Sequence, residues 1–405
     1  MYATLNRRLG HLEQVRDRTL FARARQGVEK ESLRVTGDGE IAQTPHPIAL
    51  GSTLTHASIT TDYSEALLEF ITPPLGSPDE AVSMLCEIHR FTIANLGAER
   101  LWATSMPCVV HGDDGVPIAV YGSSNSGTLR HVYRRGLALR YGRVMQVISG
   151  VHFNFSLPEA FWTALHQLEA PQSSLRDYID EGYLGLIRNV LRYGWLVLYL
   201  FGASPAVCRS FLGKDNERFS RFDDHTRYEP FATSLRMSDI GYSNRNPAGL
   251  DVSYDSLGEY IESLARAIET PYPPYERIGV VGADGYQQLN ANILQIENEY
   301  YSTVRPKRPP ARGEKPTIAL RDQGVEYIEL RSLDVDPYSP CGVDAQTLRF
   351  LETFLWFCAA HESPPMDSDE RAKASQTLTD VAYRPGPRTE ACVQRRQKRG
   401  AGLCG

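Results

Sequence analysis

A strict alternation of apolar and polar residues predicts a strand over residues 151–157. Val151, Phe153 and Phe155 are apolar, and each is followed by a polar residue. Because successive side chains of a strand point to opposite faces, one face of this strand should be buried and the other should carry polar groups. Four further stretches have similar length or a β-rich composition, namely residues 27–35, 65–71, 289–301 and 325–332.

Apolar residues at helical spacing predict four helices. The first begins at Ser77, because a capping hydroxyl followed by proline and two acids is typical of a helix N-terminus, and it should end near Gly97. The second covers residues 175–201, and the last two cover residues 255–270 and 344–360 with Asp255 and Asp344 as caps. Strands separated by helices of varied length, without a regular βαβ rhythm, favour an α+β fold with an antiparallel sheet.

The composition is that of an ordinary globular protein. The 405 residues are 42% hydrophobic and 23% charged, with a formal net charge of −6, so nothing favours nucleic acid or an anionic membrane as a partner. The seven cysteines include no C-x-x-C pair, which predicts reduced thiols in a cytoplasmic protein. The N-terminus lacks the apolar run of an export signal, and the most apolar stretch, residues 195–203, is about half as long as a membrane span requires.

Familiar catalytic motifs are missing from the sequence: it contains no phosphate-binding P-loop, dinucleotide fingerprint, zinc-protease helix or serine nucleophile elbow. Carboxylates on strands remain as candidates. Glu29 and Glu31 are two residues apart, so on a strand they share a face, with Cα atoms about 7 Å apart. Such a pair can hold a divalent cation, although a solvated strand face would look the same.

Acids recur on the other predicted strands. Glu65 and Glu69 share the polar face of residues 65–71, close after Asp62, while His152 projects with Asn154 from its strand. Glu329 and Arg331 share a face further along the chain. Each residue taken singly is as consistent with a hydrogen-bonded surface group. Together they suggest metal ions and a polyphosphate bound across one sheet face, the arrangement that phosphoryl transfer needs.

The ordered blocks of the sequence resemble the glutamate–cysteine ligases of the proteobacterial type. The first is Gly27-Val-Glu-Lys-Glu-Ser-Leu-Arg-Val35, and the last is Glu326-Tyr-Ile-Glu-Leu-Arg-Ser-Leu-Asp334. Between them lie residues 59–73, 102–107, 121–127, 133–137, 148–155, 199–205, 232–239, 294–299 and 305–308. The resemblance implies a fold similar to the catalytic part of glutamine synthetase, a saddle-like antiparallel sheet of about six strands with ATP and metals on its concave face.

The resemblance also implies roles for individual residues. Glu29, Glu31, Glu69, His152 and Glu329 look like the metal shell for Mg²⁺, with Mn²⁺ as an alternative, and Arg331 and Asp62 look like catalytic residues. Arg236 would receive a substrate α-carboxylate. The cysteine pocket would comprise Tyr63, Tyr133, Leu137, Gln146, Tyr242 and Tyr301. Tyr63 stands where the family often has Phe, which adds a hydroxyl to the aromatic wall.

The implied reaction joins L-glutamate to L-cysteine at the expense of ATP. The γ-carboxylate of glutamate attacks the γ-phosphorus of ATP to give an acyl phosphate, and the amine of cysteine then displaces phosphate, with Asp62 as an acceptor for the amine proton. The protein should act as a monomer, without nucleic acid or membrane. Two alternatives stay open: a related ligase that uses another amine, and an inactive homologue that still binds nucleotide.

The end of the chain departs from the family. We expect a shortened catalytic domain over residues 1–365 and an atypical, disordered tail over residues 366–405. After Tyr383 the sequence holds six basic residues, one acid and no apolar period. A basic tail could bind nucleic acid, but a frame change or truncation is the favoured hypothesis.

Overall fold

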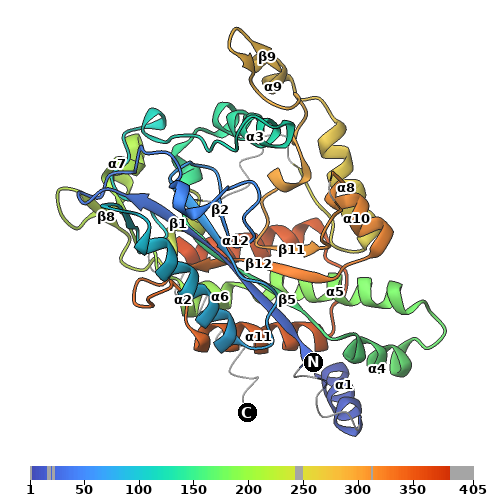
Figure 1. Ribbon diagram of the computed structural model, residues 1–405. Coiled ribbons are helices and arrows are strands. Elements are labelled where there is room, and N and C mark those ends of the chain that lie inside the picture. Colours follow the sequence, from blue (N-terminus) through green and yellow to red (C-terminus); the bar gives the residue numbers. More distant parts are fainter. Residues whose placement is uncertain (1, 16–19, 21–22, 242–249, 312, 384–405) are drawn as a thin grey trace.

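An antiparallel sheet forms the centre of the molecule. The computed structural model describes residues 2–15, 20, 23–241, 250–311 and 313–383 (Figure 1). Within them the central sheet has seven strands in the order β11-β12-β5-β1-β3-β2, with β4 paired to β1. Every pairing in it is antiparallel, which confirms the predicted α+β class. The strands are β1 (Arg25–Val35), β2 (Ile59–Thr61), β3 (Leu67–Ile71), β4 (Arg100–Leu101), β5 (Gly150–Ser156), β11 (Val304–Lys307) and β12 (Tyr327–Asp334).

Helices surround the sheet, and two small sheets lie away from it. Figure 1 shows α2 and α11 on one side of the central sheet and α3 on the other. The small sheets are formed by β6 (Ala206–Cys208), β7 (Ser220–Arg221) and β8 (Thr226–Tyr228), and by β9 (Val281–Gly282) with β10 (Gly285–Tyr286). The helices are α1 (Ala3–Gln14), α2 (Pro78–Ala94), α3 (Asn125–Tyr141), α4 (Glu159–Glu169), α5 (Leu175–Tyr193), α6 (Trp195–Phe201), α7 (Arg209–Leu212), α8 (Leu257–Glu269), α9 (Pro273–Ile278), α10 (Pro316–Gln323), α11 (Ala345–Ala360) and α12 (Ser368–Tyr383).

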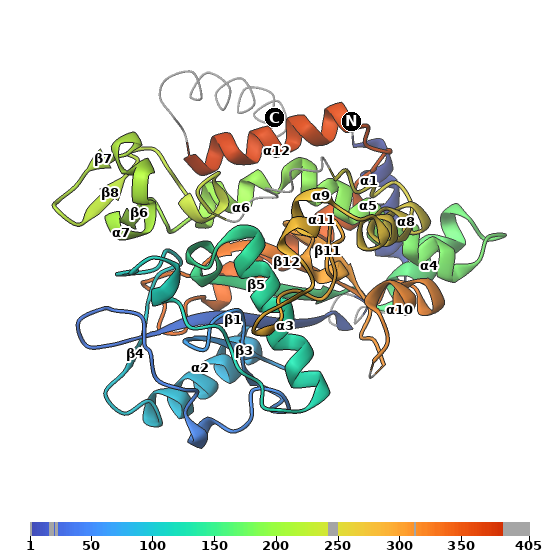
Figure 2. The ribbon, with the colours of Figure 1, turned by 90° about the horizontal axis from the view of Figure 1, so that it is seen from above.

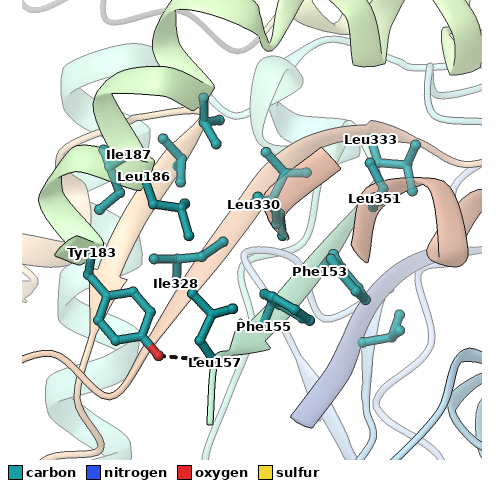
Figure 3. Close-up of a cluster of buried hydrophobic side chains, with 14 of the residues drawn as sticks. Phe153, Phe155, Leu157, Tyr183, Leu186, Ile187, Ile328, Leu330, Leu333 and Leu351 are labelled. Atoms are coloured by element: carbon teal, nitrogen blue, oxygen red, sulfur yellow. Dashed lines mark hydrogen bonds between the residues drawn. The ribbon is translucent and has the colours of Figure 1, made fainter. Parts of the chain in front are cut away.

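The main hydrophobic core lies between the apolar face of the sheet and helices α2, α5 and α11. Phe153 and Phe155 of β5 and Leu330 of β12 are fully buried in it (Figure 3). The hydroxyl of Tyr183 on α5 accepts the backbone N–H of Leu157 at 3.0 Å. The alternation seen in the sequence therefore leaves the opposite side chains of β5 and β12 on the polar face.

The predicted helices form, with two corrections. Ser77 and Asp344 cap α2 and α11 through their side chains, as predicted. The cap of α8 is Ser256, whose hydroxyl accepts from the backbone of Glu259, and not Asp255. The predicted helix over residues 175–201 is two helices, α5 and α6, bent by 54° at Gly194. A Cβ at Gly194 would lie 2.5 Å from the carbonyl oxygen of Val190, so the bend requires glycine.

One strand prediction was wrong, and another began two residues too early. Residues 289–301 form turns and a short 3-10 helix, because Asn and Gln side chains there bond the local backbone; the amide of Asn290, for example, donates to the carbonyl of Gln295 at 2.9 Å. Glu65 precedes β3, and its carboxylate accepts the backbone N–H groups of His46 and Val120, both at 2.8 Å. Glu65 therefore holds two loops and does not face the candidate site.

Two cysteines depart from the predicted reduced state. Cys86 on α2 and Cys341, before α11, form a disulfide across 255 positions of sequence. The spacing of cysteines along the chain could not show this, because the fold brings the two segments together. Cys108, Cys208 and Cys358 are free thiols.

Helix α12 occupies part of the predicted tail. It lies beside α6 in Figure 2, and its Val381 and Ala382 are buried. The backbone N–H groups of Thr233 and Ser234 both donate to the carbonyl of Ala382. Residues 384–405 lie outside the described residues, and the domain boundary at residue 365 stays a prediction. Among the described residues no single helix is long and apolar enough to cross a membrane; α5 and α6 pass that test only as a bent pair.

Candidate active site

Four neighbouring strands bring the predicted acids to one face of the sheet. Glu31 of β1 pairs with Glu69 of β3, and Glu29 of β1 pairs with His152 of β5. On the far side of β5, Glu329 of β12 stands opposite Asn154. On β3, β5 and β12 these residues alternate with apolar residues that face the core, so the strand period itself assembles the row.

Glu29, His152 and Glu329 form the tightest group in this row, which we call the acid cluster. One ligand atom from each lies within 4.8 Å of the others, as binding to one metal ion requires. The Nδ1 atom of His152 is 3.3 Å from a carboxylate oxygen of Glu29 and 3.3 Å from one of Glu329. Asn154 donates to the other oxygen of Glu29 at 2.8 Å. The group thus offers two carboxylates and an imidazole, a donor set that divalent ions accept.

Glu31 and Glu69 extend the cluster along the sheet. Glu31 accepts the backbone N–H of Gly150 at 2.6 Å, and its other oxygen is 3.8 Å from His152. Burial raises the pKa of Glu31. Burial together with the charge of Glu29 raises the pKa of Glu69 to about 8. These buried carboxylates have too few positive neighbours of their own, so a cation bound among them would be strongly stabilised.

The pKa of His152 is set by burial and by the acids close to it. Burial lowers the pKa of His152, but its contacts with Glu29 and Glu329 outweigh burial and raise it to about 9. In the metal-free protein the imidazole therefore carries a proton at neutral pH and partly balances the carboxylates. A metal ion would have to displace that proton.

Positive side chains flank the acid cluster on β11 and β12. Arg331 contacts a carboxylate oxygen of Glu329 at 2.7 Å, and Lys307 contacts the other at 3.1 Å. Burial opposes ionisation of Glu329, but Arg331 and Lys307 outweigh it and hold its pKa well below the usual value. Anionic groups and cations thus lie side by side, as binding of a metal–polyphosphate requires.

The side chain of Arg236 packs closely against the backbone of Gly150, at the start of β5. Its guanidinium donates to the backbone carbonyl of Arg331 at 2.8 Å, and a Cβ at Gly150 would lie 2.0 Å from it. Asp334 lies 3.8 Å from the guanidinium. The carboxylate of Asp334 also accepts from the hydroxyls of Ser204 and Ser234 at 2.6 and 2.9 Å. Asp334 therefore joins two loops to β12 and places Arg236.

The predicted cysteine-pocket residues are distributed over several elements. Tyr133 and Leu137 lie on α3, and Leu137 packs against the hydrophobic cluster that contains the buried Tyr63. In the part of the chain that the structure describes, the hydroxyl of Tyr63 has no hydrogen-bond partner. Tyr301 lies near Arg331, whose guanidinium carbon is 6.0 Å from the ring centre. Gln146 is buried in a short 3-10 helix, and Tyr242 lies outside the described residues. Their joint role as a pocket stays a prediction.

Asp62 forms hydrogen bonds with neighbouring side chains through its backbone carbonyl. Its carbonyl oxygen accepts from the side chain of Arg134 and from the hydroxyl of Tyr121. The carboxylate of Asp62 is half-buried, and its charge raises the pKa of Glu31 and of Glu69. In both cases burial raises the pKa more than Asp62 does.

Sequence reasoning missed Lys307 and Arg305. They are two residues apart on β11, where Arg305 pairs with Glu329 in the register. The same-face rule that found Glu29 and Glu31 would have found them, had residues 304–307 been predicted as a strand.

Comparison with known proteins places the chain in a family. The glutamate–cysteine ligase family model matches residues 9–381. The glutamate–cysteine ligase of Alcanivorax borkumensis is 54% identical over 369 residues, which are 90% of this chain and 70% of that protein. That of Pseudomonas entomophila is 52% identical over 94% of this chain and 72% of that protein.

A solved structure gives the same result. The crystal structure of the Francisella tularensis glutamate–cysteine ligase in complex with AMP superimposes with a TM-score of 0.84 at 41% identity. The match covers 89% of this chain and 71% of that one. Similarity of this extent concerns the arrangement of sheet and helices as a whole.

Proposed function

The chain belongs to the glutamate–cysteine ligase family, and from this premise we propose how its acid cluster serves the reaction. The activity is glutamate–cysteine ligation, the first step of glutathione synthesis. The observation that carries the proposal is the convergence of Glu29, His152 and Glu329 within 4.8 Å beside Arg331. The bound AMP of the Francisella tularensis enzyme supports a nucleotide site on this chain as well.

Mg²⁺ fits the acid cluster, with Mn²⁺ as an alternative. Glu29 and Glu329 would hold one ion with His152, and Glu31 and Glu69 would hold a neighbouring one. When bound, the ions neutralise phosphate charge and orient the triphosphate. The raised pKa of Glu69 supports this assignment, because burial leaves that carboxylate short of positive charge.

Positive side chains then act on the transferred phosphoryl group. Arg331 is held in place by its 2.7 Å contact with Glu329, so it costs little reorganisation to stabilise charge on the phosphate oxygens. Lys307 lies on the other side of Glu329 and adds a second charge. The γ-carboxylate of glutamate attacks the γ-phosphorus of ATP, giving an acyl phosphate and ADP.

The acceptor amine must then reach the acyl phosphate. We assign the substrate α-carboxylate to Arg236 and the side chain of cysteine to the wall formed by Tyr63, Tyr133, Leu137, Gln146, Tyr242 and Tyr301. The amine attacks the acyl carbon and phosphate leaves. Asp62 takes up the proton that the amine loses.

One assay on the purified chain tests the proposal. With ATP, Mg²⁺, glutamate and cysteine, we expect release of phosphate and formation of γ-glutamylcysteine in equal amounts. When cysteine is replaced by 2-aminobutyrate or another amine, phosphate release should be slower. Omitting Mg²⁺ should abolish both products. Faster turnover with another amine would contradict the acceptor assignment, and metal-independent turnover would contradict the role of the acid cluster.

Two smaller assignments complete the proposal. The protein acts as a monomer, which light scattering at micromolar concentration would check.

The catalytic domain ends near residue 365, although α12 follows it. Deleting residues 384–405 should leave turnover unchanged, whereas deletion from residue 366 tests the boundary. The cytoplasmic location stays a prediction.

A further inference from the structure

A cavity of about 290 Å³ lies on the side of the sheet opposite the acid cluster. Its walls come from α2, from the residues around β4 and from the turn 339–342. Cys86 and Cys341 join α2 to that turn covalently. The disulfide therefore fixes two walls of the cavity relative to each other. The volume of the cavity is close to the lower limit for ligand sites, which span about 300–1,000 Å³.

Two buried polar side chains line this cavity. Lys30 is 3% exposed and donates to the hydroxyl of Ser32. The acids next to it in sequence, Glu29 and Glu31, point to the other face of β1. His89 is 5% exposed, and no described residue forms a hydrogen bond with its Nε2 atom. The Lys30 amine contacts one hydroxyl and has no acid beside it on its face of β1, and Nε2 of His89 has no partner among the described residues, so both can bind a further polar group.

The state of His89 restricts that ligand. Burial and the charge of Lys30 lower the pKa of His89 to about 3, so the imidazole is neutral. It hydrogen-bonds the backbone of Pro340, which has only an acceptor, and so donates one N–H there. The unpartnered Nε2 is then an acceptor and calls for a ligand hydroxyl.

The charges around the cavity favour an anion. Lys30 is a buried lining residue, and Arg100 is an exposed one. The one acid in the lining, Glu99, is compensated, because Arg34 contacts its carboxylate at 2.6 Å and the hydroxyl of Thr44 donates to it. The remaining walls are largely apolar, with Leu96, Leu101, Trp102 and Val335 among them.

We propose that this cavity binds a small hydroxy-carboxylate with an apolar body. The carboxylate pairs with Lys30, the hydroxyl donates to Nε2 of His89, and the apolar body packs against Trp102 and Leu96. The site is separate from the ligase site and does not depend on the assignments made for it.

Calorimetric titration of the full chain with mandelate tests this proposal. Saturating glutamate and cysteine, without ATP, occupy the carboxylate sites of the ligase reaction. We expect millimolar affinity for mandelate and weaker binding of two matched probes: mandelamide, which lacks the charge, and phenylacetate, which lacks the hydroxyl. Lys30→Met should weaken mandelate binding about tenfold or more, the loss of one charge-assisted hydrogen bond. Arg90→Met, an exposed change on α2, should bind as the wild type does.

A second variant guards against misfolding of Lys30→Met. Ile93→Trp, at the exposed rim of the cavity, should obstruct it without touching Lys30, and should also weaken binding. Absence of mandelate binding, equal binding of mandelate and either probe, or unchanged binding in a folded Lys30→Met or Ile93→Trp variant would overturn the proposal.

Discussion

The two faces of the central sheet differ in almost every physical respect, although they share the same strands. One face carries Glu29, Glu31, Glu69, His152 and Glu329, and its chemistry comes from mutually close charges. The other face carries Val28, Phe153, Phe155 and Leu330, which belong to the main hydrophobic core. Figure 3 shows the last three. Lys30 and Ser32 are buried polar residues on that second face, and burial lowers the pKa of Lys30 to about 7.

The comparison shows how strictly the register of β1 must be kept. A slip of one residue would bury Glu29 and Glu31 under α2 and turn Val28 and Lys30 toward the acid cluster. Pairing with β3 and β5 on both sides fixes that register. Function on one face is therefore stabilised by packing on the other, and the two contributions can be separated by mutation.

The largest effect should come from the polar face. Glu329→Gln removes a proposed metal ligand and the partner of both Arg331 and Lys307, so kcat/KM should fall about a thousandfold, as for loss of a main electrostatic contact. Steady-state phosphate release measures this. The control is Glu326→Gln, an exposed acid that pairs with Arg308 and should change the rate less than about twofold. Retention of a tenth of the activity by Glu329→Gln would contradict the assignment.

The apolar face should respond in stability instead. Phe153→Ala leaves a cavity under α5 and α11 and should lower the free energy of unfolding by about 3–5 kcal/mol. The fraction that stays folded should keep a near-normal KM for ATP. Urea unfolding followed by circular dichroism gives the first quantity. A large loss of kcat without a loss of stability would show that the faces are not separable in this way.

A smaller effect should follow from the residue that places Arg236. Asp334→Asn keeps the shape but removes the charge and one acceptor for Ser204, so the KM of an amino-acid substrate should rise about tenfold or more, with a smaller change in kcat. Asp251→Asn, which alters an exposed pair with Arg371, is the control. An unchanged KM would show that Asp334 does not position Arg236 for substrate binding.

The last prediction concerns the pH dependence of metal affinity. Burial first, and then the nearby acids, raise the pKa of Glu69 to about 8, and contacts with Glu29 and Glu329 raise that of His152 to about 9. Below these values both groups hold protons that a metal must displace. Mg²⁺ affinity of the nucleotide-free protein should thus increase with pH from about 6.5 to 8.5, by up to tenfold per unit for each proton released. Glu69→Gln should flatten the slope, and a pH-independent affinity in the wild type would contradict this account.

Strands β1, β3, β5 and β12 and the positions of the acid cluster could be predicted because both depend on the period of two. Glu29, Glu31, Glu69, His152 and Glu329 were found from spacing and resemblance alone. The disulfide of Cys86 and Cys341, and the role of Asp334, could not be found in this way, because they depend on segments that meet only in the folded chain. The turns of residues 289–301 were missed since side-chain bonds to the local backbone override strand composition.

The most direct test of the central claim is a crystal structure with Mn²⁺ and a non-hydrolysable ATP analogue, with the metal located by anomalous scattering. The account predicts Mn²⁺ about 2.0–2.3 Å from carboxylate oxygens of Glu29 and Glu329, with the triphosphate against Arg331. Metal and triphosphate bound elsewhere, with the acid cluster holding only water, would contradict it.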